Sequence, residues 1–171
     1  MKIDIKNINE NNIKYAALSG VLGGIVMIVF EMFVSLTEKG FWAPIRAISA
    51  ALGMGIKDPT TQYDFFVAPV MTGIVIHIMF SMILGILFFV ILHDALKNYS
   101  LITGLAVSAA WGFIIYIVIF IVLLRLPIFS GGRIITDVVP QWAWMLGYIM
   151  FGSVGFVSLR SMKNLLIVCK K

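Results

Sequence analysis

Four long apolar stretches alternate with shorter polar segments along this chain, and their spacing predicts its architecture. They cover Tyr15–Leu36, Val67–Leu92, Leu101–Leu124 and Gln141–Leu159. As a helix rising 1.5 Å per residue, each is long enough to cross a hydrocarbon layer about 30 Å thick. We therefore expect an all-α membrane protein with four transmembrane helices.

Composition agrees with a membrane protein. Of the 171 residues, 61% are hydrophobic and 12% are charged, more apolar surface than a soluble domain of this size could bury. The first stretch is too long for the apolar core of a cleaved secretion signal, so we expect it to be retained. We expect residues 1–14 to form a cytoplasmic tail, 15–160 the transmembrane domain and 161–171 a basic tail.

Lysine and arginine predict the orientation. With four spans, both termini share one side with eight of the 13 basic residues, which are Lys2, Lys6, Lys14, Lys97, Arg160, Lys163, Lys170 and Lys171. This bias predicts cytoplasmic termini, and we place the protein in the plasma membrane. The basic residues are scattered over both sides, so we expect contact with lipid headgroups of the bilayer and no nucleic-acid binding.

Small residues recur every four positions in each stretch. The members are Gly20 and Gly24, then Gly73, Ser81 and Gly85, then Gly104, Ser108 and Gly112, and finally Gly147 and Gly155. Spacing of four keeps such residues on one side of a helix, where they let helix backbones approach closely inside a membrane. They predict the packing contacts of a compact four-helix bundle.

The two halves of the chain resemble each other. At two constant offsets, the matched positions are Pro69, His77 and Ser81 with Pro140, Tyr148 and Gly152, and Gly20 and Gly24 with Gly104 and Ser108. This pattern predicts a parallel two-helix repeat. Chance similarity between apolar helices is the alternative.

The external loop, residues 37–66, contains a helical pattern over residues 41–55. Trp42 and Ile45 fall on one side of it and Arg46 on another. This arrangement predicts a short helix lying in the membrane interface, with Trp42 at headgroup depth. The helix is either a connector that seals the outer end of the bundle, or a lid or docking surface for a neighbouring subunit. In the docking case, Trp42 and Arg46 are the candidate contacts.

Two ionisable residues, Glu31 and His77, lie at membrane depth, where each carries a free-energy cost that calls for a reason. A proton relay or cation site would need them in contact. Alternatively, His77 is hydrogen-bonded to a facing serine, tyrosine or carbonyl. Glu31 is then a partly hydrated carboxylate, paired with Arg46 or Lys39.

Nothing in the sequence indicates a metal, a cofactor or a catalytic centre. His93 follows His77 by sixteen residues, about 24 Å along a helix, so the two cannot share one haem iron. Cys169 is the only cysteine, which excludes an intrachain disulfide. We expect no catalytic, cofactor-binding or metal-binding residues.

Glycine and aromatic residues recur over most of the chain in a pattern that can be compared with that of other membrane proteins. Its parts are Gly20 and Gly24, Gly73-x3-His77-x3-Ser81-x3-Gly85, Trp111-Gly112 running to Leu126-Pro127, and Leu146-Gly147-Tyr148. The pattern resembles that of small prokaryotic four-helix membrane proteins of unknown function. In those proteins a histidine often stands where Tyr148 stands here. The resemblance implies the four-helix fold and no known activity.

Two functions of different class fit these observations. The first is a non-catalytic accessory subunit of a larger membrane complex, such as a respiratory complex or a copper membrane monooxygenase. Small size, few polar groups at depth and the external helix favour it. The second is a stand-alone transporter or channel with Glu31 and His77 in its pathway. We favour the first, and expect other integral membrane subunits as partners and no enzyme activity in this chain.

Overall fold

A computed structural model describes residues 10–51, 65–96, 100–122 and 138–169. The described helices are α1 (Glu10–Ser35), α2 (Ala43–Ala51), α3 (Val67–Leu96), α4 (Leu101–Tyr116), its π-helical continuation η2 (Ile117–Val122), and α6 (Gln141–Cys169). Four of them are long and apolar enough to cross a membrane. The prediction of an all-α fold with four membrane-length helices is confirmed.

The helices extend beyond the apolar stretches that predicted them. α1 begins at Glu10, in a polar turn where Lys14 Nζ lies 2.7 Å from Glu10 Oε1. Such a pair, four residues apart on an exposed helix face, supports a turn that hydrophobic periodicity alone does not indicate. α6 likewise continues past Leu159 to Cys169. Most of the expected N-terminal tail, residues 1–9, lies outside the described residues.

The turn between α1 and α2 depends on Gly40. Its φ of 95° lies in the left-handed region, which glycine adopts without a steric penalty. Its backbone N–H donates to the Ser35 carbonyl at 3.0 Å, and its own carbonyl accepts from the Ala43 N–H at 3.1 Å. Gly40 therefore ends the last turn of α1 and leads directly into α2.

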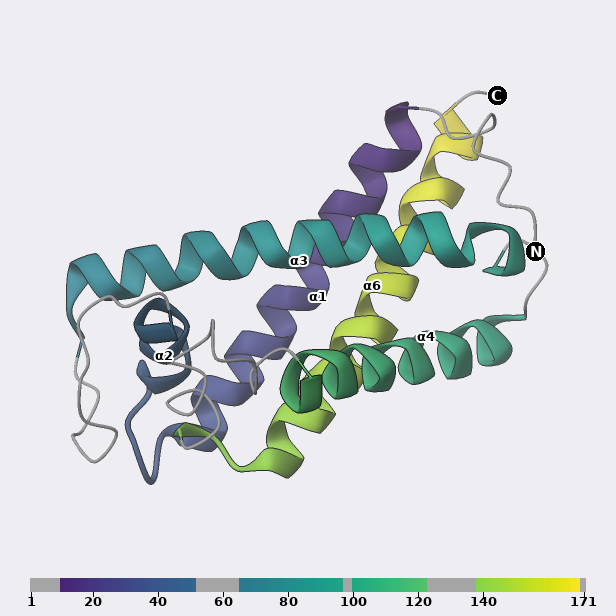
Figure 1. The fold of residues 1–171 in the computed structure, drawn as a ribbon. Coiled ribbons are helices and arrows are strands. Elements are labelled where there is room, and N and C mark those ends of the chain that lie inside the picture. Colours follow the sequence, from purple (N-terminus) through teal and green to yellow (C-terminus); the bar gives the residue numbers. More distant parts are fainter. Residues whose placement is uncertain (1–9, 52–64, 97–99, 123–137, 170–171) are drawn as a thin grey trace.

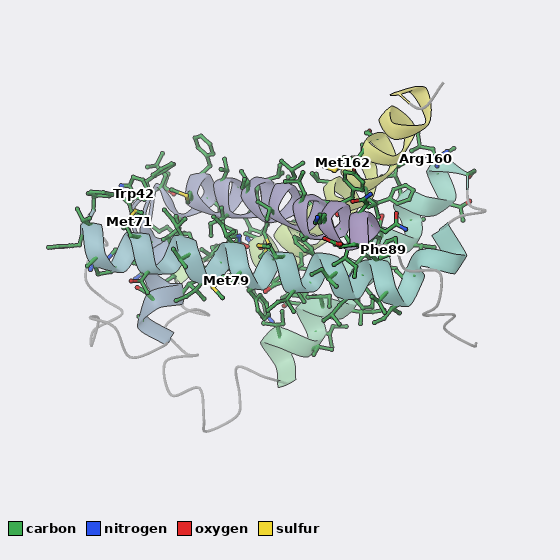
Figure 2. The ribbon with its side chains drawn as sticks, turned by 90° about the horizontal axis from the view of Figure 1, so that it is seen from above. Trp42, Met71, Met79, Phe89, Arg160 and Met162 are labelled. Atoms are coloured by element: carbon green, nitrogen blue, oxygen red, sulfur yellow. The ribbon has the colours of Figure 1, made fainter. Side chains whose placement is uncertain are left out.

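α1 and α6 run side by side, and α3 and α4 cross in front of them in the view of Figure 1. α1 contacts α3 on one face and α6 on another, and α6 contacts α4. A ring contact between Phe88 and Trp111, with centroids 6.1 Å apart, also links α3 to α4. A larger share of α1 and α6 than of α3 and α4 is buried. Figure 2 shows Trp42 and Met71 at one end of the molecule and Arg160 at the other, with Met79 between them along α3.

α1 packs against α3, and α4 against α6, with close contacts between the helix backbones at glycine positions. A Cβ added at Gly20 would overlap the Ser81 carbonyl and the Gly85 backbone, and one at Gly24 would overlap the Ser81 side chain. In the second pair, a Cβ at Gly112 would overlap the backbone of Tyr148. The other predicted packing positions lie as follows: Gly73 against Ile45, Gly85 against Ala16 and Gly20, Gly104 against Phe156, Ser108 against Gly152, Gly147 against Glu31, and Gly155 in ordinary contact with Ser19.

α2 packs into one end of the molecule, which differs from the one-sided interfacial helix that the sequence predicted. Ile45 packs with Ile28 and Val70, while Ala43 and Ala47 belong to the cluster that contains the start of α6. Both sides of α2 are therefore buried. Gly73 of α3 allows this close approach, because a Cβ there would overlap the Ile45 backbone and side chain. The predicted part of this helix beyond residue 51 lies outside the described residues.

Candidate functional site

A stripe of α1 residues spaced by four faces α6. A Cβ at Gly23 would meet the Phe151 carbonyl, a Cβ at Gly147 would meet Met27 and Glu31, and a Cβ at Gly155 would meet the Ser19 carbonyl. Residues four apart lie on one side of a helix, so Glu31 continues the stripe of Ser19, Gly23 and Met27. The carboxyl group thus projects into the α1–α6 interface.

Glu31 is completely buried there, with a relative exposure of 0%. Neither of its side-chain oxygens has a hydrogen-bond partner among the described residues. Gly147 makes the room for the carboxyl group, because a Cβ at this position would lie 2.8 Å from Glu31 Oε1. Complete burial differs from the partly hydrated carboxylate that the sequence offered as an alternative, while its pairing with Arg46 or Lys39 stays a prediction.

Apolar and aromatic side chains surround this part of the interface. Met27 belongs to a buried cluster with Trp144 and Tyr148 of α6, and with Ala43 and Ala47 of α2. Tyr148 follows Gly147, the α6 residue that lies against the Glu31 carboxyl group. α2 therefore packs at the Glu31 end of the interface, and Tyr148 contributes a polar side chain to the same cluster.

A carboxyl group in this setting has a restricted chemistry. An isolated charge placed in apolar surroundings costs several kcal/mol, about 3 kcal/mol for an acidic side chain at the centre of a membrane helix. The group must therefore carry a proton or meet a cation whenever the interface is closed. A proton needs no cavity and no further ligands, so it is the partner that this closed interface accommodates directly.

His77 lies in a different interface. Its Nε2 is 2.9 Å from the Gly24 carbonyl oxygen, so the ring links α3 to α1 at the level of the Ser81 contact. Gly24 precedes Glu31 by seven residues, about 10 Å along α1. The structure therefore does not bring His77 and Glu31 together. The hydrogen bond to a facing carbonyl is one of the alternatives that the sequence left open for His77.

The two candidate docking residues lie at the α2 end. Trp42 is half-buried, and its ring packs 5.2 Å from that of Phe41 and 4.9 Å from that of Phe65, centroid to centroid. Arg46 retains only 8% exposure, with its guanidinium 4.9 Å from the centre of the Phe66 ring. Docking through these residues stays a prediction. On this geometry, a partner would meet Trp42 rather than Arg46.

Within the described ranges, no three or more His, Cys, Asp or Glu side chains group together as metal ligands would. The site consists instead of one carboxyl group and its apolar surroundings. These described residues therefore offer no group of side chains as a candidate metal site.

Tyr148 and the α6-facing stripe of α1 are the features that sequence reasoning missed. The small residues Gly20 and Gly24 indicated the α3-facing side of α1, and His77 was then the natural partner to consider for Glu31. The missed signal was a second stripe, since Gly23, Met27 and Glu31 repeat at the same spacing of four. On α6, Ala143 and Gly147 provide a matching small surface.

Comparison of the chain with models of protein families, with curated proteins and with solved structures finds no match. The resemblance to small four-helix membrane proteins therefore stays a prediction.

Proposed function

We propose that this chain is a multi-pass membrane protein with both termini on the cytoplasmic side. Four membrane-length helices support insertion. The start of α1 and the end of α6 share one end of the molecule, where Ala16 packs with Phe156 and Leu159. Arg160 lies at this end (Figure 2), in agreement with the distribution of basic residues that predicted the orientation.

We also propose that α1–α3 and α4–α6 are repeats of one two-helix unit. The sequence offsets match Gly24 with Ser108 and Ser81 with Gly152. In the structure Gly24 packs on Ser81 and Ser108 packs on Gly152, so matched positions make matched contacts. Glu31 then lies at the junction between the two repeats, which is where membrane transporters built from repeats commonly bind substrates and coupling ions.

On this basis we propose that the protein is a small proton transporter in which Glu31 takes up and releases the proton. The observation that carries the proposal is the complete burial of a carboxyl group whose two oxygens find no hydrogen-bond partner in the described part of the chain. Ionisable side chains inside a membrane are costly, and they commonly belong to proton and ion pathways.

The geometry suggests how the proton would reach the site. With α1 against α6 and α2 across the end of their interface, Glu31 holds its proton away from water. Release requires α2 to move, or α1 and α6 to part near Gly147, so that water reaches the carboxylate. The tight crossings at Gly20–Gly85 and Ser108–Gly152 lie within the repeats, so this motion leaves each repeat intact.

Proton flux into vesicles tests this function. The purified protein in liposomes that contain a pH-sensitive dye should admit protons when a potassium diffusion potential drives them. Glu31→Gln should reduce the rate to that of protein-free vesicles, because the amide cannot exchange a proton. Glu10→Gln is the matched control, since Glu10 is exposed at the start of α1, and it should retain the wild-type rate. Equal rates for wild-type protein and Glu31→Gln would exclude the proposal.

An accessory subunit of a larger membrane complex remains the second candidate. The outward faces of α3 and α4 favour it, because they are exposed and apolar over much of their length. Their exposed members include Met71, Val75, Met79 and Ile83 of α3, and Ile102, Phe113 and Ile114 of α4. Other subunits or lipid would cover these faces. Purification from native membranes in mild detergent distinguishes the two, since a fixed stoichiometry with larger subunits would favour the accessory role.

A further inference from the structure

We propose that Tyr148 is the positioning residue for Glu31. When the proton leaves Glu31, the phenolic O–H of Tyr148 donates a hydrogen bond to the carboxylate and makes its charged form tolerable inside the interface. This inference rests on the proposed proton exchange at Glu31 and names the residue that supports it. Charge is conserved in the step, since the proton passes from Glu31 to water while Tyr148 keeps its own.

The position of Tyr148 follows from the packing of α6. Gly147 leaves room for the Glu31 carboxyl group, since a Cβ there would lie 2.8 Å from Glu31 Oε1, and Tyr148 is the next residue along the same helix. Its side chain is 6% exposed and packs in the cluster that contains Met27, one helical turn before Glu31. Gly147 and Met27 thus place Tyr148 in the same part of the α1–α6 interface as the Glu31 carboxyl group.

Other polar groups near α1 are placed less well for this role. From α3, His77 is engaged at Gly24, about 10 Å along α1 from Glu31. From α2, Arg46 stacks on Phe66. From α6, Trp144 brings an indole N–H into the same cluster as Tyr148. That N–H is the competing donor, and the experiment below separates it from the phenol.

Infrared difference spectroscopy between acidic and alkaline pH tests the assignment on the full-length protein. The stretching band of the deprotonated Glu31 carboxylate, which appears as the pH rises, is the band that Glu31→Gln removes. We expect Tyr148→Phe to shift this band and to lower proton flux about tenfold or more, the effect of one hydrogen bond to a charged group. Tyr116→Phe is the matched control. Tyr116 is 5% exposed, and its ring lies 6.3 Å from that of Tyr148.

The outcomes separate the two proposals. If Tyr148→Phe shifts the band and Tyr116→Phe does not, the positioning role stands. If the band titrates in the wild type but is unmoved by Tyr148→Phe, Tyr148 only fills space and the donor is another group such as Trp144. If no band is lost in Glu31→Gln, then Glu31 does not exchange a proton and the proposed function itself fails.

Discussion

Gly85→Ala should lower the free energy of unfolding by about 2–3 kcal/mol, the cost of forcing extra volume into a packed contact. The added Cβ would lie 2.7 Å from the Gly20 Cα, and it would also press on the Ala16 carbonyl. Both obstacles are backbone atoms, so only a separation of α1 from α3 relieves the overlap. An SDS titration followed by helical circular dichroism measures the change.

Gly155→Ala is the control that isolates this effect. The substitution is the same and the residue also lies inside a long helix, so the helix-propensity gain of about 0.5–1 kcal/mol applies to both variants. At Gly155 the new Cβ would lie 3.6 Å from the Ser19 carbonyl oxygen, an ordinary contact. This variant should be as stable as the wild type or slightly more stable. Equal losses in the two variants would contradict the close α1–α3 crossing.

Glu31→Met should raise the free energy of unfolding by about 1–3 kcal/mol while abolishing proton exchange. The wild-type carboxyl group loses its hydration on folding and gains no hydrogen bond from the residues that the structure describes, and methionine of similar size removes that cost. A gain in stability joined to a loss of function is expected for a residue retained for its chemistry. The same SDS titration, together with the vesicle assay, measures both effects.

Glu10→Met serves as the reference for this prediction. Glu10 lies in the exposed first turn of α1, where it makes only a surface ion pair with Lys14, worth less than about 1 kcal/mol. Its replacement should not increase stability. A Glu31→Met protein that is less stable than the wild type would show that the carboxyl group has structural partners, and would argue against the environment described for it.

The sequence predicted the helices well because their signals are local. Apolar runs long enough to span a membrane indicated α1, α3, α4 and α6. Stripes of small residues indicated where helices approach each other, as at Gly20 and Gly85. Polar turns such as Glu10–Lys14 were missed, because hydrophobicity does not mark a helix that extends into water.

The candidate site could be predicted only in part, because it depends on which helix faces which. Sequence spacing identified Glu31 as a costly residue, but it could not decide whether α3 or α6 covers it. Membrane helices have several small-residue faces, and their pairing is a tertiary property. The burial of Arg46 was missed for the same reason, since the periodicity of α2 gives no sign that both of its sides are covered.

Carbodiimide labelling tests the central claim most directly. Dicyclohexylcarbodiimide is an apolar reagent that modifies protonated carboxyl groups inside membranes, and mass spectrometry of peptides locates the adduct. Of the eight acidic residues in the chain, we expect Glu31 to be modified, with labelling that declines as the pH rises. Labelling confined to other carboxyl groups, or a Glu31 that stays unmodified at every pH, would contradict a proton-exchanging site in the α1–α6 interface.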